Sequence, residues 1–467
     1  MKKTNTSALF LATALSALLA RPSLAAVSAE EAKQLGTTLT EWGAEKGGNA
    51  DGSIPAYTGG LQKVPGYDPK ASAHYVDPFA DEKPLFTIDA RNVAQYADQM
   101  TEGSKALFRA YPDYRIDVYP THRSVRYAPW VVQNTLKNAT TATLGGQIKG
   151  DAVLGADKGN FPFAGIPFPV PKDAYEVMWN YKMKFMAPLR LSRTQGFLVD
   201  SAGNVTELPV QDEYLVSPWY DPKDTMRLQL HNAYFGFNAT QIKPPSSAGT
   251  VFLNFYLPTA ETQKVWFYTP GQRRIRMAPE FAYDVPIAAY GGVIFWDDIT
   301  GFVGRMDRFD FNLVGKKEII VPYNVFGITN TMTKKEDFLG PKFVKAGIRF
   351  EKHRVWVVDS VRKASARHAY SRRTFYVDED SWAIVATEAY DNSGKIWRVS
   401  HHAVYPTYDV GGVQADGWAT YDLMKGNYFM INVAMGHPGH FMHCYSSVEG
   451  MKLPPLTPAA VEASGVR

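Results

Sequence analysis

From residue 184 onward the chain is a succession of short strand-like segments with no helical pattern between them. Turn signals at residues 378–380 and 391–394 join the last three of these segments into a meander. Parallel sheets need helices between their strands. We therefore expect an α+β fold with a large curved antiparallel β-sheet. The predicted strands are residues 197–205 as a hairpin, then 251–257, 264–269, 292–296, 354–361, 374–378, 382–390 and 396–405.

The first part of the chain carries the helical patterns. Helices are predicted at residues 28–42, 89–110 and 173–181. The first opens with a capping box of Ser28 and Glu31, and the last with Asp173 and Glu176. Residues 47–84 are rich in Pro, Gly and Asp but too aromatic for a free linker. This N-terminal stretch is expected to lie extended on the body of a single domain, and residues 145–171 to form a long irregular loop.

The N-terminus has the layout of a secretory signal peptide. Lys2 and Lys3 precede an apolar run at residues 8–20, and Ser23 and Ala25 supply the small residues before a cleavage site. Residues 1–25 are thus predicted to be the signal and residues 26–467 the mature domain. The absence of a cysteine near this site argues against a lipid anchor. A periplasmic location follows.

Composition narrows the function further. The net charge of +4 falls to +1 once Lys2, Lys3 and Arg21 leave with the signal, which argues against nucleic acid. Aromatic residues make up 13% of the chain and suit either a well-filled core or an apolar cavity. Nucleophile-elbow, zinc-helix, Walker and dinucleotide motifs are missing from the sequence. We expect a protein that is not an enzyme and needs no cofactor.

The segment from Trp266 to Arg276 is the first candidate for ligand binding. Its two strands flank a Pro-Gly turn, and Arg274 and Arg276 share one strand face. Paired guanidinium groups can hold a carboxylate or phosphate head group. The sequence equally allows these arginines to pair with structural acids, and the candidates for this are Asp297, Asp298 and Asp307. The predicted ligand-binding residues are Trp266, Tyr268, Arg274, Arg276, Met178 and Met183.

A group of histidines near the C-terminus offers an alternative. His437, His440, His443 and Cys444 lie within eight residues and carry donors that Zn²⁺ or Cu⁺ prefers. Pro438 and Gly439 break any helix there, so a loop of structural or solvated histidines fits the spacing as well.

Several motifs together resemble a family of periplasmic proteins of Gram-negative bacteria. The members carry a domain of unknown function and are often labelled outer-membrane lipoprotein-sorting proteins. The matching pieces are WGAEKGGNADGSIPAYTGG at 42–60, YTPGQRRIR at 268–276, AYDVP at 282–286, Asp297-Asp298 before Gly301-Phe302, RFD at 308–310, GKKE at 315–318 and VPYN at 321–324. The resemblance implies a fold similar to the LolA/LolB carriers, an incomplete barrel wrapped over helices with a cavity for acyl chains. It also implies an RND-type inner-membrane exporter and an outer-membrane protein as partners.

These observations predict a periplasmic carrier or binding protein for a lipid or other hydrophobic molecule. Two other functions remain open at this point. One is a metal-binding protein or metal-dependent hydrolase that uses the C-terminal His/Cys group. The other is an envelope scaffold that docks proteins through a sheet edge or an apolar patch.

Overall fold

The computed structural model describes residues 27–464 except 225, 228, 279–281, 434 and 454. The predicted signal peptide lies outside the described residues. Within the described chain, no helix combines the length and apolar character that crossing a membrane requires.

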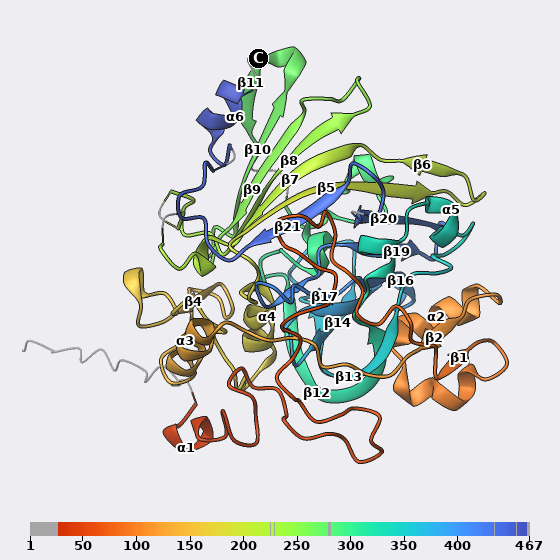
Figure 1. Cartoon of the computed structure of the whole chain (residues 1–467), viewed down its shortest axis with the longest axis horizontal. Coiled ribbons are helices and arrows are strands. Elements are labelled where there is room, and N and C mark those ends of the chain that lie inside the picture. Colours follow the sequence, from red (N-terminus) through yellow and green to blue (C-terminus); the bar gives the residue numbers. More distant parts are fainter. Residues whose placement is uncertain are drawn as a thin grey trace, which may run out of the picture.

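A single sheet of 17 strands dominates the molecule (Figure 1). Strand β5 (Leu189–Val199) lies in its middle and pairs with β7 along one edge and with β20 and β21 along the other. The upper arm runs from β5 through β7 (Val210–Val216), β8 (Phe235–Lys243), β9 (Val251–Tyr256), β10 (Gln263–Thr269) and β11 (Arg274–Met277).

The lower arm is reached from β5 through β20 (Asn427–Val433) and β19 (Trp418–Asp422). It consists of β16 (Ile396–His402), β15 (Ile384–Tyr390), β14 (Arg372–Asp378), β13 (Phe350–Arg362) and β12 (Phe309–Pro322). Shorter strands complete the sheet, namely β1 (Phe86–Ile88), β2 (Ile116–Val118), β6 (Val205–Glu207) and β21 (Phe441–Tyr445).

The neighbouring strands are antiparallel, and the sheet is mixed only because β2 meets β13 in parallel. The two arms end in β11 and β12, which do not pair with each other in the described chain, so the sheet does not close into a barrel. The predicted fold, a large curved sheet that forms an incomplete barrel, is confirmed. Two separate two-stranded sheets consist of β3 (Thr143–Gly145) with β4 (Ala152–Leu154) and β17 (Tyr405–Pro406) with β18 (Val413–Gln414).

Helix α4 (Ala174–Lys182) packs against β12 and β13, beside the curve of the lower arm (Figure 1). Asp173 caps it by accepting hydrogen bonds from the backbone N–H groups of Tyr175 and Glu176. The Glu176 carboxylate accepts from the Lys172 N–H rather than closing the predicted box. The other helices are α1 (Ala29–Ala32), α2 (Glu102–Ala110), α3 (Pro129–Ala139), α5 (Lys335–Phe338) and α6 (Pro458–Ser464).

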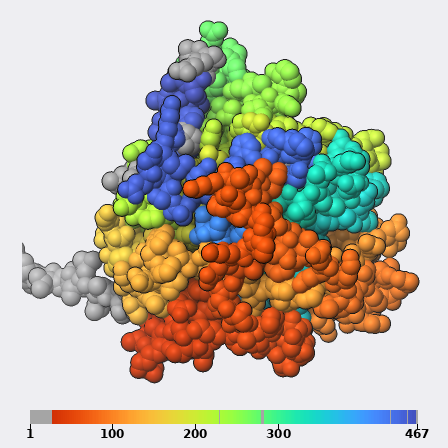
Figure 2. Space-filling view, viewed as in Figure 1, coloured from red at the N-terminus to blue at the C-terminus, as the bar shows by residue number. Residues whose placement is uncertain are grey.

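The N-terminal segment, residues 42–84, lies extended across the body (Figure 2). Its polar groups bond to residues that come much later in the chain. The Trp42 carbonyl accepts from the Trp382 indole at 3.0 Å, and the Gly47 carbonyl accepts from Arg354 at 3.0 Å. Tyr75 donates its hydroxyl to Asp409 at 2.8 Å. The segment is therefore an integral layer of the domain.

Several local predictions were wrong. The helix predicted at 28–42 keeps its capping box but ends at Ala32, and the chain turns at Gly36, whose φ of +82° suits glycine. The helix predicted at 89–110 splits into a 3₁₀ segment (Val93–Gln99) and α2, because Thr101 caps a new helix by accepting from the Ser104 N–H. The strand predicted at 292–296 is a turn that leads into the 3₁₀ segment Trp296–Gly301.

Candidate functional site

A cavity lies between the inner face of the upper arm and the cap segment, which we define as residues 285–304. Its volume is ≈ 100 Å³. The apolar lining comes from the strands (Leu215, Phe235, Phe237, Ala239, Phe252, Trp418, Ile431), from the link between β6 and β7 (Leu208, Pro209) and from the cap segment (Ile287, Ala289, Tyr290, Trp296, Ile299). Gln211, Glu213, Gln241, Thr300, Asp416 and Asn432 add polar groups. A mostly apolar cavity with a few convergent polar groups is the usual form of a small-molecule site.

Strand alternation explains which side chains reach the cavity. On β8, Phe235, Phe237 and Ala239 are two residues apart and so share one face. Ala239 lies directly opposite Phe252 of β9, whose ring contacts that of Phe267 on β10 at 4.8 Å between centroids. This continuous aromatic face forms one wall of the cavity.

The cap segment is fixed to the lower arm by buried charges. Arg373 of β14 donates to Asp297 at 3.0 Å and to Asp298 at 2.7 Å. Tyr370 donates its hydroxyl to Asp298 at 2.7 Å. Arg398 of β16 donates to the carbonyl of Gly292 at 2.8 Å. These bonds satisfy charges that would be costly to bury alone, so the cap segment has a defined position over the cavity.

One end of the cavity is charged. Glu213 and Asp416 line it, and both carboxylates accept from the buried Arg190, at 2.9 Å and 2.5 Å respectively. Burial raises the pKa of Glu213 to about 7, although the Arg190 charge opposes this shift. The second oxygen of Asp416, Oδ2, is buried and has no hydrogen-bond partner among the described residues. The polar end therefore retains an unused acceptor.

A smaller cavity of ≈ 20 Å³ adjoins this charged end and shares Phe235, Thr300 and Asp416 with the larger one. Lys182 and Lys184 line it. Burial lowers the pKa of Lys182 to about 7 and that of Lys184 to about 8, against the attraction of nearby acids. Lys182 donates to the Gly304 carbonyl at 2.6 Å.

The predicted apolar ligand residues do not line this cavity. Trp266 and Tyr268 lie opposite Leu253 and Val251, on the outer face of the upper arm. They pack there in a cluster that includes Val448, Leu456 and Val461 of the C-terminal segment. Met178 and Met183 are buried in the main core around α4. Their role in ligand binding stays a prediction.

Arg274 and Arg276 lie on β11, and both are exposed. The hairpin with β10 that the sequence predicted is present, with Thr269 opposite Arg274. The three acids named as candidate partners for these arginines bind other residues. Asp297 and Asp298 bind Arg373, and Asp307 lies 3.7 Å from Arg305.

Two members of the predicted C-terminal metal set, His443 and Cys444, point in different directions. His443 and Cys444 are neighbours on β21 and therefore face opposite sides of the strand. Cys444 is buried and accepts from Gln414, and burial raises the pKa of its thiol to about 12. The rings of His437 and His440 lie 5.2 Å apart. In the described chain, no three residues of the predicted four-residue metal set have their ligand atoms within 4.8 Å of one another.

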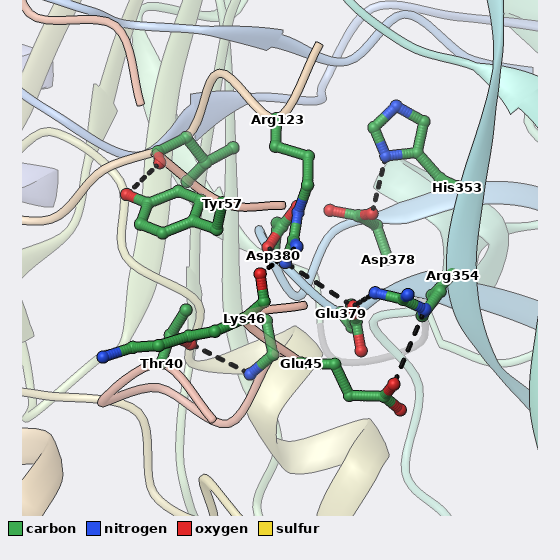
Figure 3. A network of polar contacts seen from close by, with 12 residues as sticks. Thr40, Glu45, Lys46, Tyr57, Arg123, His353, Arg354, Asp378, Glu379 and Asp380 are labelled. Atoms are coloured by element: carbon green, nitrogen blue, oxygen red, sulfur yellow. Dashed lines mark hydrogen bonds and ion pairs between the residues drawn. The ribbon is translucent and has the colours of Figure 1, made fainter. Parts of the chain in front are cut away.

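Sequence reasoning missed a buried cluster on the lower arm (Figure 3). In the described chain, three potential metal ligands lie within 4.8 Å of one another only at His353, Asp378 and Asp380. Their donor atoms are already engaged. Arg123 binds both oxygens of Asp380, at 2.7 and 2.8 Å, and His353 lies between Glu351 at 3.1 Å and Asp378 at 3.5 Å.

Burial acts to lower the pKa of His353, but its bonds to Asp378 and Glu351 raise it to about 9. The imidazole is therefore protonated at neutral pH and has no lone pair for a metal. In the same network Arg354 links Glu379 to Glu45 of the N-terminal segment (Figure 3). The cluster fits a structural role, in which it holds that segment on the sheet.

Comparison with known proteins identifies the family. The model of a family described as a protein of unknown function, DUF1329, matches residues 87–458. The chain belongs to the DUF1329 family. An uncharacterized protein of Pseudomonas aeruginosa is 37% identical over 458 residues, which is 96% of each chain.

Two solved structures are similar at low identity. A domain from Vibrio parahaemolyticus named for outer membrane lipoprotein sorting gives a TM-score of 0.41 at 12% identity, and the match covers 62% of this chain and 97% of that one. A LolA superfamily protein from Nitrosomonas europaea gives 0.33 at 10% identity, over 56% and 91% of the two chains. The match to the DUF1329 model confirms the family predicted from the sequence.

Proposed function

We propose that this protein is a periplasmic carrier or binding protein for a lipid or other hydrophobic molecule, without enzymatic activity. The cavity between the upper arm and the cap segment carries the proposal. Its wall of aromatic and aliphatic side chains hides apolar groups from water, and each buried CH₂ group contributes about 0.8 kcal/mol. A ligand with a long alkyl chain gains most from such a site.

The cavity is smaller than its proposed cargo. Pockets for small molecules commonly occupy about 300–1,000 Å³, whereas this cavity has ≈ 100 Å³. A bound alkyl chain therefore needs part of the cap segment to move outward. The segment has no strand of its own, and its regular parts are two short 3₁₀ segments (Ala288–Tyr290 and Trp296–Gly301). The Ala288–Tyr290 turn can shift while Asp297 and Asp298 keep the later part bound to Arg373.

Plugging the cavity tests the proposal. Ala289 lies exposed at the cavity edge, and we expect Ala289→Trp to fill the space and abolish binding of the fluorescent probe N-phenyl-1-naphthylamine. Ala288→Trp is the matched control, because Ala288 is also exposed on the same turn but does not line the cavity. Fluorescence titration compares the two variants with the unaltered protein.

Equal binding by all three proteins would show that the probe sits elsewhere and would contradict the proposal. Solvent extraction of the protein purified from its native envelope, followed by mass spectrometry, is expected to release a lipid-like molecule. An empty protein that also refuses the probe would favour the scaffold alternative. The RND-type exporter and outer-membrane partner stay predictions from the family resemblance.

A further inference from the structure

The charged end of the cavity indicates which kind of hydrophobic molecule fits. Glu213 and Asp416 are the only ionisable acids or bases among the described residues that line the larger cavity, apart from the phenol of Tyr290. Both are nearly fully buried, with 4% of each residue exposed. The remaining polar lining residues carry amides or hydroxyls.

Only one of the two carboxylate oxygens of Asp416 has a hydrogen-bond partner in the described chain. Its Oδ1 accepts from the Arg190 guanidinium, while Oδ2 is buried without a partner in the described chain. Buried polar atoms almost always have a partner, and the exceptions need an explanation. A hydrogen-bond donor on a bound molecule would provide that partner.

The nearby groups do not already satisfy this oxygen. Arg190 Nη1 donates to Asp416 Oδ1 and to Gln414 at 3.1 Å, and its Nη2 donates to Glu213. Gln211 donates to Glu213 at 2.7 Å. Asn432 donates to the Asp416 backbone carbonyl at 3.1 Å, not to its carboxylate. Lys184 makes a 3.5 Å contact with the Tyr181 carbonyl and lies over the Tyr181 ring.

We infer that the ligand is an amphiphile whose inner end carries a hydrogen-bond donor, a hydroxyl or a protonated amine, that binds Asp416. This inference rests on the proposed function of the cavity. A fatty carboxylate fits poorly, because it would place another carboxyl group beside those of Asp416 and Glu213 and offers no hydrogen-bond donor when ionised. The lysines that could attract it line only the smaller cavity beyond Asp416.

Four ligands with the same alkyl chain test the inference without altering the protein. We would measure displacement of N-phenyl-1-naphthylamine by 1-dodecanol, dodecylamine, dodecyl methyl ether and sodium dodecanoate at pH 7. The ether accepts but cannot donate a hydrogen bond. The alcohol and the amine are expected to bind at least ten times more tightly than the ether and the carboxylate.

The substitution Asp416→Asn is expected to weaken the amine tenfold or more, and to leave the ether unchanged. Gln241→Glu is the matched control, since it adds a carboxylate at another position of the cavity lining without touching Asp416. If Asp416→Asn does not fold, the ligand series in the unaltered protein still decides.

The outcomes separate the two claims. Equal binding of all four ligands would overturn the donor inference and leave the carrier function standing. Tighter binding of dodecanoate, abolished by Lys184→Met, would also overturn it and would place the head group in the smaller cavity. A protein that binds neither the probe nor any of the four ligands would overturn the carrier function itself.

Discussion

The upper and lower arms of the sheet are antiparallel ladders of similar construction, yet their inner faces meet different partners. Helix α4 fills the lower arm, where Tyr175 contacts Phe311 at 5.4 Å between ring centroids. Phe375 of β14 lies 5.4 Å from Phe302 and 6.2 Å from Phe311. The upper arm faces the cap segment, which has no α-helix, and keeps a cavity. A curved sheet thus provides stability where a helix fills it and a binding site where only a loop covers it.

The largest difference between the two arms is expected when one phenylalanine of each inner face is replaced by alanine. Phe375→Ala removes a fully buried ring, and we expect it to lower the free energy of unfolding by about 3–5 kcal/mol. Phe237→Ala removes a half-buried ring that faces existing free space, so its cost should stay below about 2 kcal/mol. Urea unfolding followed by tryptophan fluorescence measures both. Equal costs would mean that the upper arm is as tightly packed as the lower one.

The charge of His353 makes the lower arm sensitive to pH. Its pKa is about 9 in the folded protein against an ordinary value of 6.5, so its stabilising effect is complete below pH 6.5 and is lost as the pH rises through 9. We expect the stability difference between the unaltered protein and His353→Gln to shrink by about 1–3 kcal/mol from pH 6 to pH 9.5. Denaturant unfolding across this range measures it.

The comparison with His353→Gln is needed because other groups titrate in the same window. The lowered pKa values of Lys182 and Lys184 make the protein more stable as the pH rises above about 7. The raised pKa of Glu213 has the opposite effect, because stability falls as the pH rises from 4.5 to about 7. His437→Gln, on an exposed loop, serves as the matched control. A pH-independent difference for His353→Gln would show that His353 is not charged in the folded protein.

The smallest effect is expected at the edge of the upper arm. Replacing Arg274 and Arg276 together by Gln should change stability by less than about 0.5 kcal/mol, because both are exposed. Probe affinity should also stay unchanged, since neither lines the cavity. A clear loss of affinity in the fluorescence titration would support the head-group role that the sequence predicts for these arginines.

In the second half of the chain, the sequence predicted the positions of strands better than which face of each strand points to the inside of the sheet. Turn residues and alternation located the β5–β6 hairpin, the β10–β11 hairpin and the β14–β16 meander. Strands β8, β12, β19, β20 and β21 were not predicted. In β12 the charged centre at residues 315–318 and the bulge at Leu313 and Gly315 interrupt the apolar pattern.

The site was harder to predict because both faces of the upper arm are covered. Trp266 and Phe267 are adjacent aromatic residues on β10, and alternation alone places them on opposite faces without saying which face is inside. The C-terminal segment covers Trp266, so the aromatic ring of Trp266 packs against that segment and does not mark a cavity. Asp297 and Asp298 were noted in the sequence, but their partners Arg373 and Arg398 are distant in the chain.

The extended N-terminal segment has a consequence for how the molecule assembles. Trp42, Gly47 and Tyr75 find their partners at Trp382, Arg354 and Asp409, more than 300 residues later. Contacts between distant residues form slowly because a long loop must close first. These three contacts can therefore form only when the last third of the chain is available. They join the two ends of the sequence, so that loss of either end should leave the other without part of its support.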